Sequence, residues 1–235
     1  MNNVKKSIGW ADYTINPIKG LCPVDCKDNQ GKSYCYACRM YKRFKWNPKI
    51  RLTPLLDVHV PEGSRIFVGS TIELFGEWIK SEWLEYIFKW VHAHPYHTFI
   101  FLTKQPTELI NWSPFPPNCF VGVTATDNDQ FRHAVYHLAH IKAEVKYISF
   151  EPLLEYIPMA AMPDFVNWVI IGQQTPIKKA TMPKIEWIQE IVEACDKANI
   201  PVFLKNNLYP ILGLGNGKSI CHNNDIGTLR QEFPK

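Results

Sequence analysis

The sequence predicts an α/β fold with parallel strands, arranged as a partial (β/α)6-type TIM-like barrel in a single domain over residues 1–235. Short apolar runs recur along the chain, with helical or loop stretches between them. Each run is almost continuously apolar in its first part, as strands buried on both faces are. Six or seven such units fit the 235 residues of one domain. A doubly wound open sheet is the alternative, because periodicity alone does not separate the two folds.

The predicted strands share a β-branched or aromatic run that ends in small or polar residues, as in "RIFVGST" and "HTFIFLTK". The first strand precedes a cluster of cysteines, and the others follow it. The strands are expected near residues 12–18, 65–71, 97–104, 119–126, 145–152, 167–175 and 201–207.

The stretches between these strands carry helical signals. Apolar residues recur at helical spacing over 76–94 and again over 182–200. Asp127 and Asn128 precede a third such stretch, 129–141, and their side chains suit the N-cap position of a helix. Strands that alternate with helices are typical of parallel α/β folds.

Polar side chains follow nearly every predicted strand. Because ligands of α/β folds bind at the carboxyl ends of the strands, these residues predict one shared polar site. A carboxylate such as Glu151 is costly to bury unless it is paired, so a salt bridge with a strand-end lysine is the structural alternative. The candidate residues are Ser70, Thr71, Thr103, Lys104, Thr124, Thr126, Glu151, Gln173 and Lys205.

Four of the seven cysteines lie within residues 20–40, with the spacing C-x3-C-x8-C-x2-C. The chain has no apolar run of about 20 residues and no signal-peptide pattern, so we expect a cytoplasmic protein with no membrane partner. In a reducing compartment, clustered thiols indicate metal or redox chemistry more than disulfides. Zinc held by four thiolates and an iron–sulfur cluster both remain open at this point. The four residues are Cys22, Cys26, Cys35 and Cys38.

The segment 32–51 carries seven basic residues and no acidic one, and it is interleaved with aromatic residues. Lysine and arginine neutralise phosphates, and aromatic rings stack on unpaired bases. The segment therefore indicates a nucleic acid or nucleotide partner. The alternative is a solvated helix face, with several of the aromatic side chains in the core.

The cysteine loop and the strand pattern together resemble the radical S-adenosylmethionine (radical SAM) superfamily. The resemblance is to a phage- and mobile-element-associated family of unknown function, distantly like spore photoproduct lyase. Cys35-Tyr36-Ala37 matches the third cysteine of its C-x3-C-x2-C signature, which implies Cys22, Cys26 and Cys35 as cluster ligands and leaves Cys38 as an alternative ligand. The stretch 27–33 then corresponds to an insertion. "IIGQQT" departs from a Gly-Gly-Glu-like segment.

The resemblance implies an enzyme with one [4Fe–4S] cluster that cleaves S-adenosylmethionine reductively and forms a 5′-deoxyadenosyl radical. The strand-end residues would hold the cofactor, with Ser70 and Thr71 near its amino group and Gln173 near its adenine. A flavodoxin- or ferredoxin-like electron donor is implied as a partner. A zinc-stabilised nucleic-acid-binding protein without catalysis is the alternative from another class. A third possibility is a protein that binds the cluster and turns over poorly.

Overall fold

The computed structural model describes residues 1–6, 8–55, 59–213, 221–222 and 228–234. The chain divides into two compact units, each of which is described here by itself. Unit 1 comprises Met1–Val121 and Ile141–Glu144, and unit 2 comprises Gly122–His140 and Val145–Lys235. The single-domain organisation stays a prediction.

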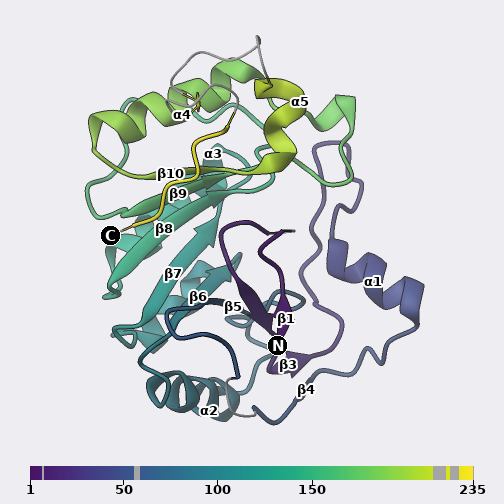
Figure 1. Cartoon of the computed structure of the whole chain (residues 1–235). Coiled ribbons are helices and arrows are strands. Elements are labelled where there is room, and N and C mark those ends of the chain that lie inside the picture. The colour runs from purple at the N-terminus through teal and green to yellow at the C-terminus, as the bar shows by residue number, and fades with distance from the viewer. Residues whose placement is uncertain (7, 56–58, 214–220, 223–227, 235) are drawn as a thin grey trace. The chain divides into compact units, whose positions relative to one another are not determined.

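Unit 1 is built on short parallel strands (Figure 1). Strand β2 (Tyr13–Ile15) pairs in parallel with β5 (Arg65–Val68), which pairs in parallel with β6 (Thr98–Thr103). Strand β1 (Asn2–Asn3) lies antiparallel to β2 at the edge. A separate two-stranded sheet joins β3 (Ile18–Lys19) to β4 (Arg51–Leu52).

The described residues of unit 1 also form two α-helices and a 3-10 helix. Helix α2 (Ser81–His92) buries Leu84, Ile87 and Val91, and its Phe88 ring meets Phe101 of β6 at a centroid distance of 5.4 Å. The spacing of these apolar residues follows the helical repeat, so one face of α2 covers the strands. Helix α1 (Tyr36–Phe44) follows the cysteine loop, and a 3-10 helix spans Pro106–Trp112.

Unit 2 repeats the pattern with strands β8 (Val145–Phe150), β9 (Trp168–Ile171) and β10 (Val202–Leu204), which pair in parallel in that order. Every residue of β9 and β10 is buried, as expected for strands covered on both faces. Helix α4 (Ile185–Lys197) runs alongside β10 (Figure 1). The remaining elements are α3 (Asn128–Ala139), α5 (Tyr209–Leu212) and 3-10 helices over Lys179–Thr181 and Asn206–Leu208.

The α/β class with mostly parallel strands is confirmed. All seven predicted strands are present, including β7 (Cys119–Thr124), and each is shorter than expected because its polar end belongs to the following turn. The cap of α3 is confirmed, since Asp127 Oδ1 accepts a hydrogen bond from Gln130 N at 2.8 Å. Within each unit the described strands form an open array and not a closed barrel. None of the helices in the described ranges has the length and apolar character needed to cross a membrane.

Candidate metal and cofactor site

The segment 27–33, which the sequence marks as an insertion, folds into a small hairpin in unit 1. Lys27 and Ser33 pair as an antiparallel bridge. Asp28 is buried, and its Oδ1 accepts hydrogen bonds from Gln30 N at 3.1 Å and Lys32 N at 2.9 Å. Gly31 closes the turn with a φ of +73°, a conformation that glycine adopts without strain. The hairpin therefore brings the two ends of the segment 27–33 side by side.

This return brings Cys26 next to Cys35. Tyr34 N donates a hydrogen bond to Cys26 O at 3.0 Å, so the backbone at Cys26 lies beside the residue that precedes Cys35. The hydrogen bond from Cys26 lowers the pKa of Cys35 to about 5 and raises the pKa of Cys26 above its ordinary value. Cys35 is therefore the preferred thiolate of the pair. The hairpin thus closes the eight-residue gap in sequence between the two cysteines.

Cys35 is also the N-cap of α1. Its sulfur accepts a hydrogen bond from Cys38 N at 3.4 Å and another from the Cys38 thiol. Burial and this contact raise the pKa of Cys38 to about 11. Backbone N–H groups at the first turn of a helix stabilise negative charge, which suits a thiolate at this position. Cys35 thus contacts both of its neighbouring cysteines in the loop.

Cys22 is hydrogen-bonded to the turn that follows β5. Its sulfur accepts a hydrogen bond from Glu73 N at 3.4 Å, and burial raises the pKa of this thiol. The buried Glu73 carboxylate accepts hydrogen bonds from Thr103 Oγ1 at 2.7 Å and from Lys104 N at 2.8 Å. Glu73 therefore ties the cysteine loop to the carboxyl end of β6. The positive charge of Lys104 lies close enough to Cys26 to favour its thiolate.

Asn16 organises the neighbouring strand end. Its Oδ1 accepts hydrogen bonds from Thr71 N and Thr71 Oγ1, both at 3.1 Å, and from Ser70 Oγ at 3.2 Å. Asn16 follows β2, while Ser70 and Thr71 follow β5. The structure therefore brings together two of the predicted cofactor residues and fixes their hydroxyl groups at the end of parallel strands.

The side chains of this loop are of the type that binds metals as thiolates. Four free cysteines, all partly exposed, lie on one short loop and the first turn of α1. Thiolate is the ligand type that iron–sulfur clusters and structural zinc share. In the described ranges, no three or more His, Cys, Asp or Glu side chains are grouped closely enough to hold a metal ion.

Unit 2 carries the other strand-end candidates. Lys205 Nζ forms an ion pair with Glu151, whose side chain is 24% exposed. Gly172 lies against this pair, since a Cβ there would be 3.0 Å from Lys205 Cδ and 3.3 Å from Glu151 Cγ. The glycine thus leaves room for the ion pair. Glu151 therefore forms a salt bridge with a strand-end lysine, which is the structural alternative given for it above.

Gln173 is hydrogen-bonded to the turn that follows β10. Asn207 Nδ2 donates a hydrogen bond to Gln173 O at 2.8 Å, and Gln173 Nε2 donates one to Asn207 O. Thr126 is nearly buried, and its hydroxyl donates to Asp127 Oδ2 at 3.1 Å. Thr124 is also buried, at 3% exposure. These residues all lie at strand ends of unit 2. That they share one site with the residues of unit 1 stays a prediction.

The basic segment forms α1, and here one expectation is wrong. The alternative for this segment placed several of its aromatic side chains in the core, but within α1 only Tyr41 among them is buried. Tyr36, Phe44 and Trp46 are exposed at 48%, 49% and 44%. The reason is that α1 turns only one narrow stripe, with Ala37 and Tyr41, toward the rest of unit 1.

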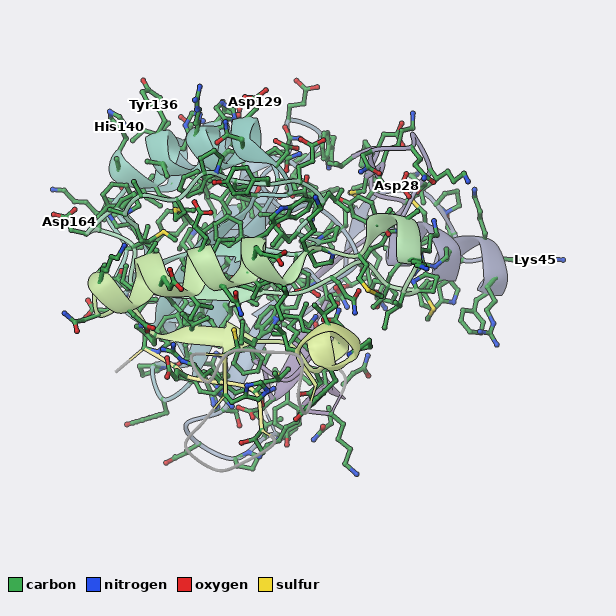
Figure 2. The ribbon with its side chains drawn as sticks, turned by 90° about the horizontal axis from the view of Figure 1, so that it is seen from above. Asp28, Lys45, Asp129, Tyr136, His140 and Asp164 are labelled. Carbon is green, nitrogen blue, oxygen red and sulfur yellow. The ribbon has the colours of Figure 1, made fainter. Side chains whose placement is uncertain are left out.

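Three histidines form another cluster of titratable side chains, on α3. His133 Nε2 and His137 Nε2 lie 3.0 Å apart on an exposed surface, and burial lowers the pKa of His137. His140 Nδ1 lies 2.7 Å from Tyr136 O. Figure 2 shows Tyr136 and His140 on the outer side of α3. This arrangement is a surface stripe at helical spacing.

A family model described as a protein of unknown function, DUF5131, matches residues 5–208. The chain belongs to the DUF5131 family. The matched region contains the four loop cysteines and every strand-end candidate, so the whole candidate site lies within the part of the chain that defines DUF5131. Searches among curated proteins and among solved structures found no significant match.

Three residues of the site were missed in the sequence. Asn16 and Asn207 lie in the second half of the predicted strands 12–18 and 201–207, so the rule that found the other strand-end residues would also have found them. Glu73 gave no such signal. Its role arises because the turn after β5 folds back onto β6, which the local pattern "GSTIELFG" does not reveal.

Proposed function

We propose that this DUF5131 protein is a radical SAM enzyme that binds a [4Fe–4S] cluster through Cys22, Cys26 and Cys35. The observation that carries the proposal is the hairpin over 27–33, whose bridge between Lys27 and Ser33 and hydrogen bond from Tyr34 N to Cys26 O close the gap of eight residues between Cys26 and Cys35. The insertion therefore does not keep apart two of the three ligands that the resemblance implies. The proposal includes a partial (β/α)6-type barrel, with the cysteine loop, residues 20–40, at the carboxyl ends of the strands.

The cofactors would be the cluster and S-adenosylmethionine. When bound, they supply one-electron reductive cleavage to methionine and a 5′-deoxyadenosyl radical, with the electron coming from a flavodoxin- or ferredoxin-like donor. The chain's own residues would bind and orient the cofactor. Asn16 fixes the hydroxyl groups of Ser70 and Thr71, which suit an amino group. Thr124, Thr126, Glu151 and Gln173 are the candidates in unit 2.

Two of the candidates have structural roles that limit direct cofactor contact. Thr103 is 1% exposed, and its hydroxyl donates to Glu73 and accepts from Gln105 N. Lys205 is paired with Glu151. We assign Thr103 to positioning the strand end. Lys205 would neutralise Glu151 until a cofactor hydroxyl or ammonium group replaces it.

A zinc site with four thiolates is the second candidate function, in a nucleic-acid-binding protein without catalysis. The hydrogen bond from Cys38 N to the Cys35 sulfur favours it, because it places Cys38 beside Cys35. The two functions differ in their use of Cys38. A [4Fe–4S] cluster with three protein ligands leaves it free, while a closed zinc site requires it.

The decisive test compares Cys35→Ala with Cys38→Ala in protein purified without oxygen. We expect about four irons per chain and a brown colour in the wild type and in Cys38→Ala, and loss of both in Cys35→Ala. Release of 5′-deoxyadenosine with dithionite tests turnover. A colourless protein with one zinc per chain, lost equally from both variants, refutes the proposal and supports the zinc site. A cluster without 5′-deoxyadenosine indicates a protein that binds but does not turn over.

The substrate class that we propose is a nucleic acid or nucleotide. The support for it is the basic aromatic segment 32–51, which begins within the cysteine loop. The first turn of α1 holds Cys35 and Cys38, so a ligand on this helix lies beside the thiols.

A further inference from the structure

We infer that the exposed surface of α1 and of the turn after it binds single-stranded nucleic acid. This surface, called the α1 platform, combines two stacked aromatic rings with several cations, all of them on exposed residues. It consists of Lys42, Arg43, Phe44, Lys45, Trp46 and Lys49. The binding inference stands by itself, and it rests on the proposed function only for any reaction that follows binding.

The rings of the platform have the geometry of a stacking surface. Phe44 and Trp46 lie with their centroids 5.6 Å apart and their planes inclined by 21°. The Arg43 guanidinium carbon lies 5.3 Å from the Phe44 centroid. Nearly half of each aromatic side chain is exposed, although burial would be favourable. An unpaired base continues such a stack, because every base has a flat π-face.

The platform is held in place by the buried side of α1. Tyr41 is buried, and its hydroxyl oxygen accepts a hydrogen bond from Gly20 N at 2.7 Å. Trp46 N donates to Tyr41 O at 3.2 Å, and its ring meets the Tyr41 ring edge-on at 5.3 Å. Lys45 makes this return of the chain with a φ of +49°. The two outer rings are therefore fixed against the unit, which lowers the entropy cost of binding.

The charge of the platform is uniformly positive. The sequence has no acidic residue between positions 29 and 56. Lys42, Lys45 and Lys49 are exposed, and none of them forms an ion pair with another residue in the described ranges. Lys45 projects outward beyond the end of α1 (Figure 2). Cations with no acidic partner beside stacking rings match the alternation of phosphates and bases in a single strand.

Other occupants fit these observations less well. A membrane-bound helix needs a wide apolar face toward the lipid, whereas the apolar stripe of α1, with Ala37 and Tyr41, is buried in the protein. An acidic peptide would use the cations and leave the ring stack without a function. Duplex nucleic acid keeps its bases stacked within the helix, so it too has no use for the rings.

The test is fluorescence anisotropy of a labelled oligothymidylate of about 20 nucleotides, titrated with the full chain purified without oxygen at several salt concentrations. Phe44→Ala should weaken binding by about 5- to 150-fold, since stacking contributes about 1–3 kcal/mol per base. Lys45→Gly removes a charge and keeps the cap, because glycine prefers this conformation. It should make the negative slope of log Kobs against log salt shallower by about 0.7.

Two controls separate the platform from general effects. Tyr96→Ala removes a ring that is 71% exposed elsewhere in unit 1 and should leave binding unchanged. Trp46→Phe keeps a ring and should retain most of the binding. Loss of binding in Phe44→Ala supports the inference only if the variant has the same thermal melting temperature as the wild type. If Phe44→Ala melts at a lower temperature, the salt dependence of Lys45→Gly is the deciding measurement.

Several results would overturn the inference. They are no binding at low salt, equal binding by Phe44→Ala and the wild type, or equal affinity for a duplex of the same length. Binding to phosphatidylserine vesicles in place of the oligonucleotide would make the platform a membrane site. Release of 5′-deoxyadenosine is measured on the same preparation. Binding without release refutes the proposed chemistry alone, and release without binding refutes the platform alone.

Discussion

Asp28→Ala should open the hairpin over 27–33 and separate Cys26 from Cys35. The side chain of Asp28 is 5% exposed and accepts two backbone hydrogen bonds, from Gln30 N and Lys32 N. Each hydrogen bond to a charged acceptor contributes about 1.5–3 kcal/mol. Gln30 and Lys32 are exposed, so water can replace part of the lost hydrogen bonding when Asp28 is removed. The lower value of about 1.5 kcal/mol per hydrogen bond therefore applies. The sum is about 3 kcal/mol, which raises the opening equilibrium about a hundredfold.

The assay is limited proteolysis with trypsin, with cleavage after Lys32 followed by mass spectrometry. When reclosing is fast relative to cleavage, the cleavage rate follows the population of the open form. We expect an increase of about a hundredfold in Asp28→Ala and about tenfold in Asp28→Asn, because the amide is a neutral acceptor. Asn29→Ala is the matched control in the same turn. Its side chain forms no hydrogen bond with the described residues, and its cleavage rate should equal that of the wild type.

The same variants test the link between the hairpin and the proposed cluster. Asp28→Ala should retain less iron than Asn29→Ala after reconstitution with limiting iron. In Asp28→Ala the loop is open before iron binds, so the free-energy cost of ordering it reduces the free energy of iron binding. Cleavage after Lys32 at the wild-type rate would refute the role of Asp28. Faster cleavage with full iron content would show that the hairpin does not hold the two cysteines together.

Two further predictions concern stability. Hydrogen bonds from Arg65, two of them from the guanidinium at 3.1 Å, outweigh burial and lower the pKa of Asp12. This pair therefore stabilises the fold above the unfolded carboxyl pKa of about 3.9, and the stabilisation is lost as the pH falls through the lower folded pKa. Asp12→Asn should lower the free energy of unfolding by about 1–3 kcal/mol at pH 7 in urea melts. The difference should shrink toward pH 3, and a constant difference would contradict the pairing. Gly122→Ala should cost about 1–3 kcal/mol or more, since its Cβ would lie 2.3 Å from the buried Tyr147 ring. An unchanged melting temperature would show that the ring moves aside freely.

Much of the fold could be read from the sequence, because its signals are local. Near-continuous apolar runs mark strands buried on both faces, and β9 and β10 are buried at every position. The cap at Asp127 needs only the residue itself and the helix that follows. The strand ends were overestimated because Gly69 and its polar neighbours look like strand residues but belong to the turn after β5.

The candidate site was predictable where it depended on residue type and position at a strand end. Ser70 and Thr71 were found in this way, and Asn16 was missed although the same rule applies to it. Glu73 was not predictable, because its partners Thr103 and Lys104 are about 30 residues away. Hydrogen bonds over such a distance depend on how two turns meet in space, and no local pattern encodes that.

The sequence by itself determined the chemistry that is available, which is four thiols on one loop, a positively charged aromatic segment and polar residues after parallel strands. The tertiary structure decided how these groups are used. It closed the insertion into a hairpin, so that Cys26 meets Cys35, and it turned Phe44 and Trp46 outward instead of into the core. The physical reason is the same in both cases. A side chain's neighbours depend on backbone turns such as those at Gly31 and Lys45, and composition and spacing do not record their direction.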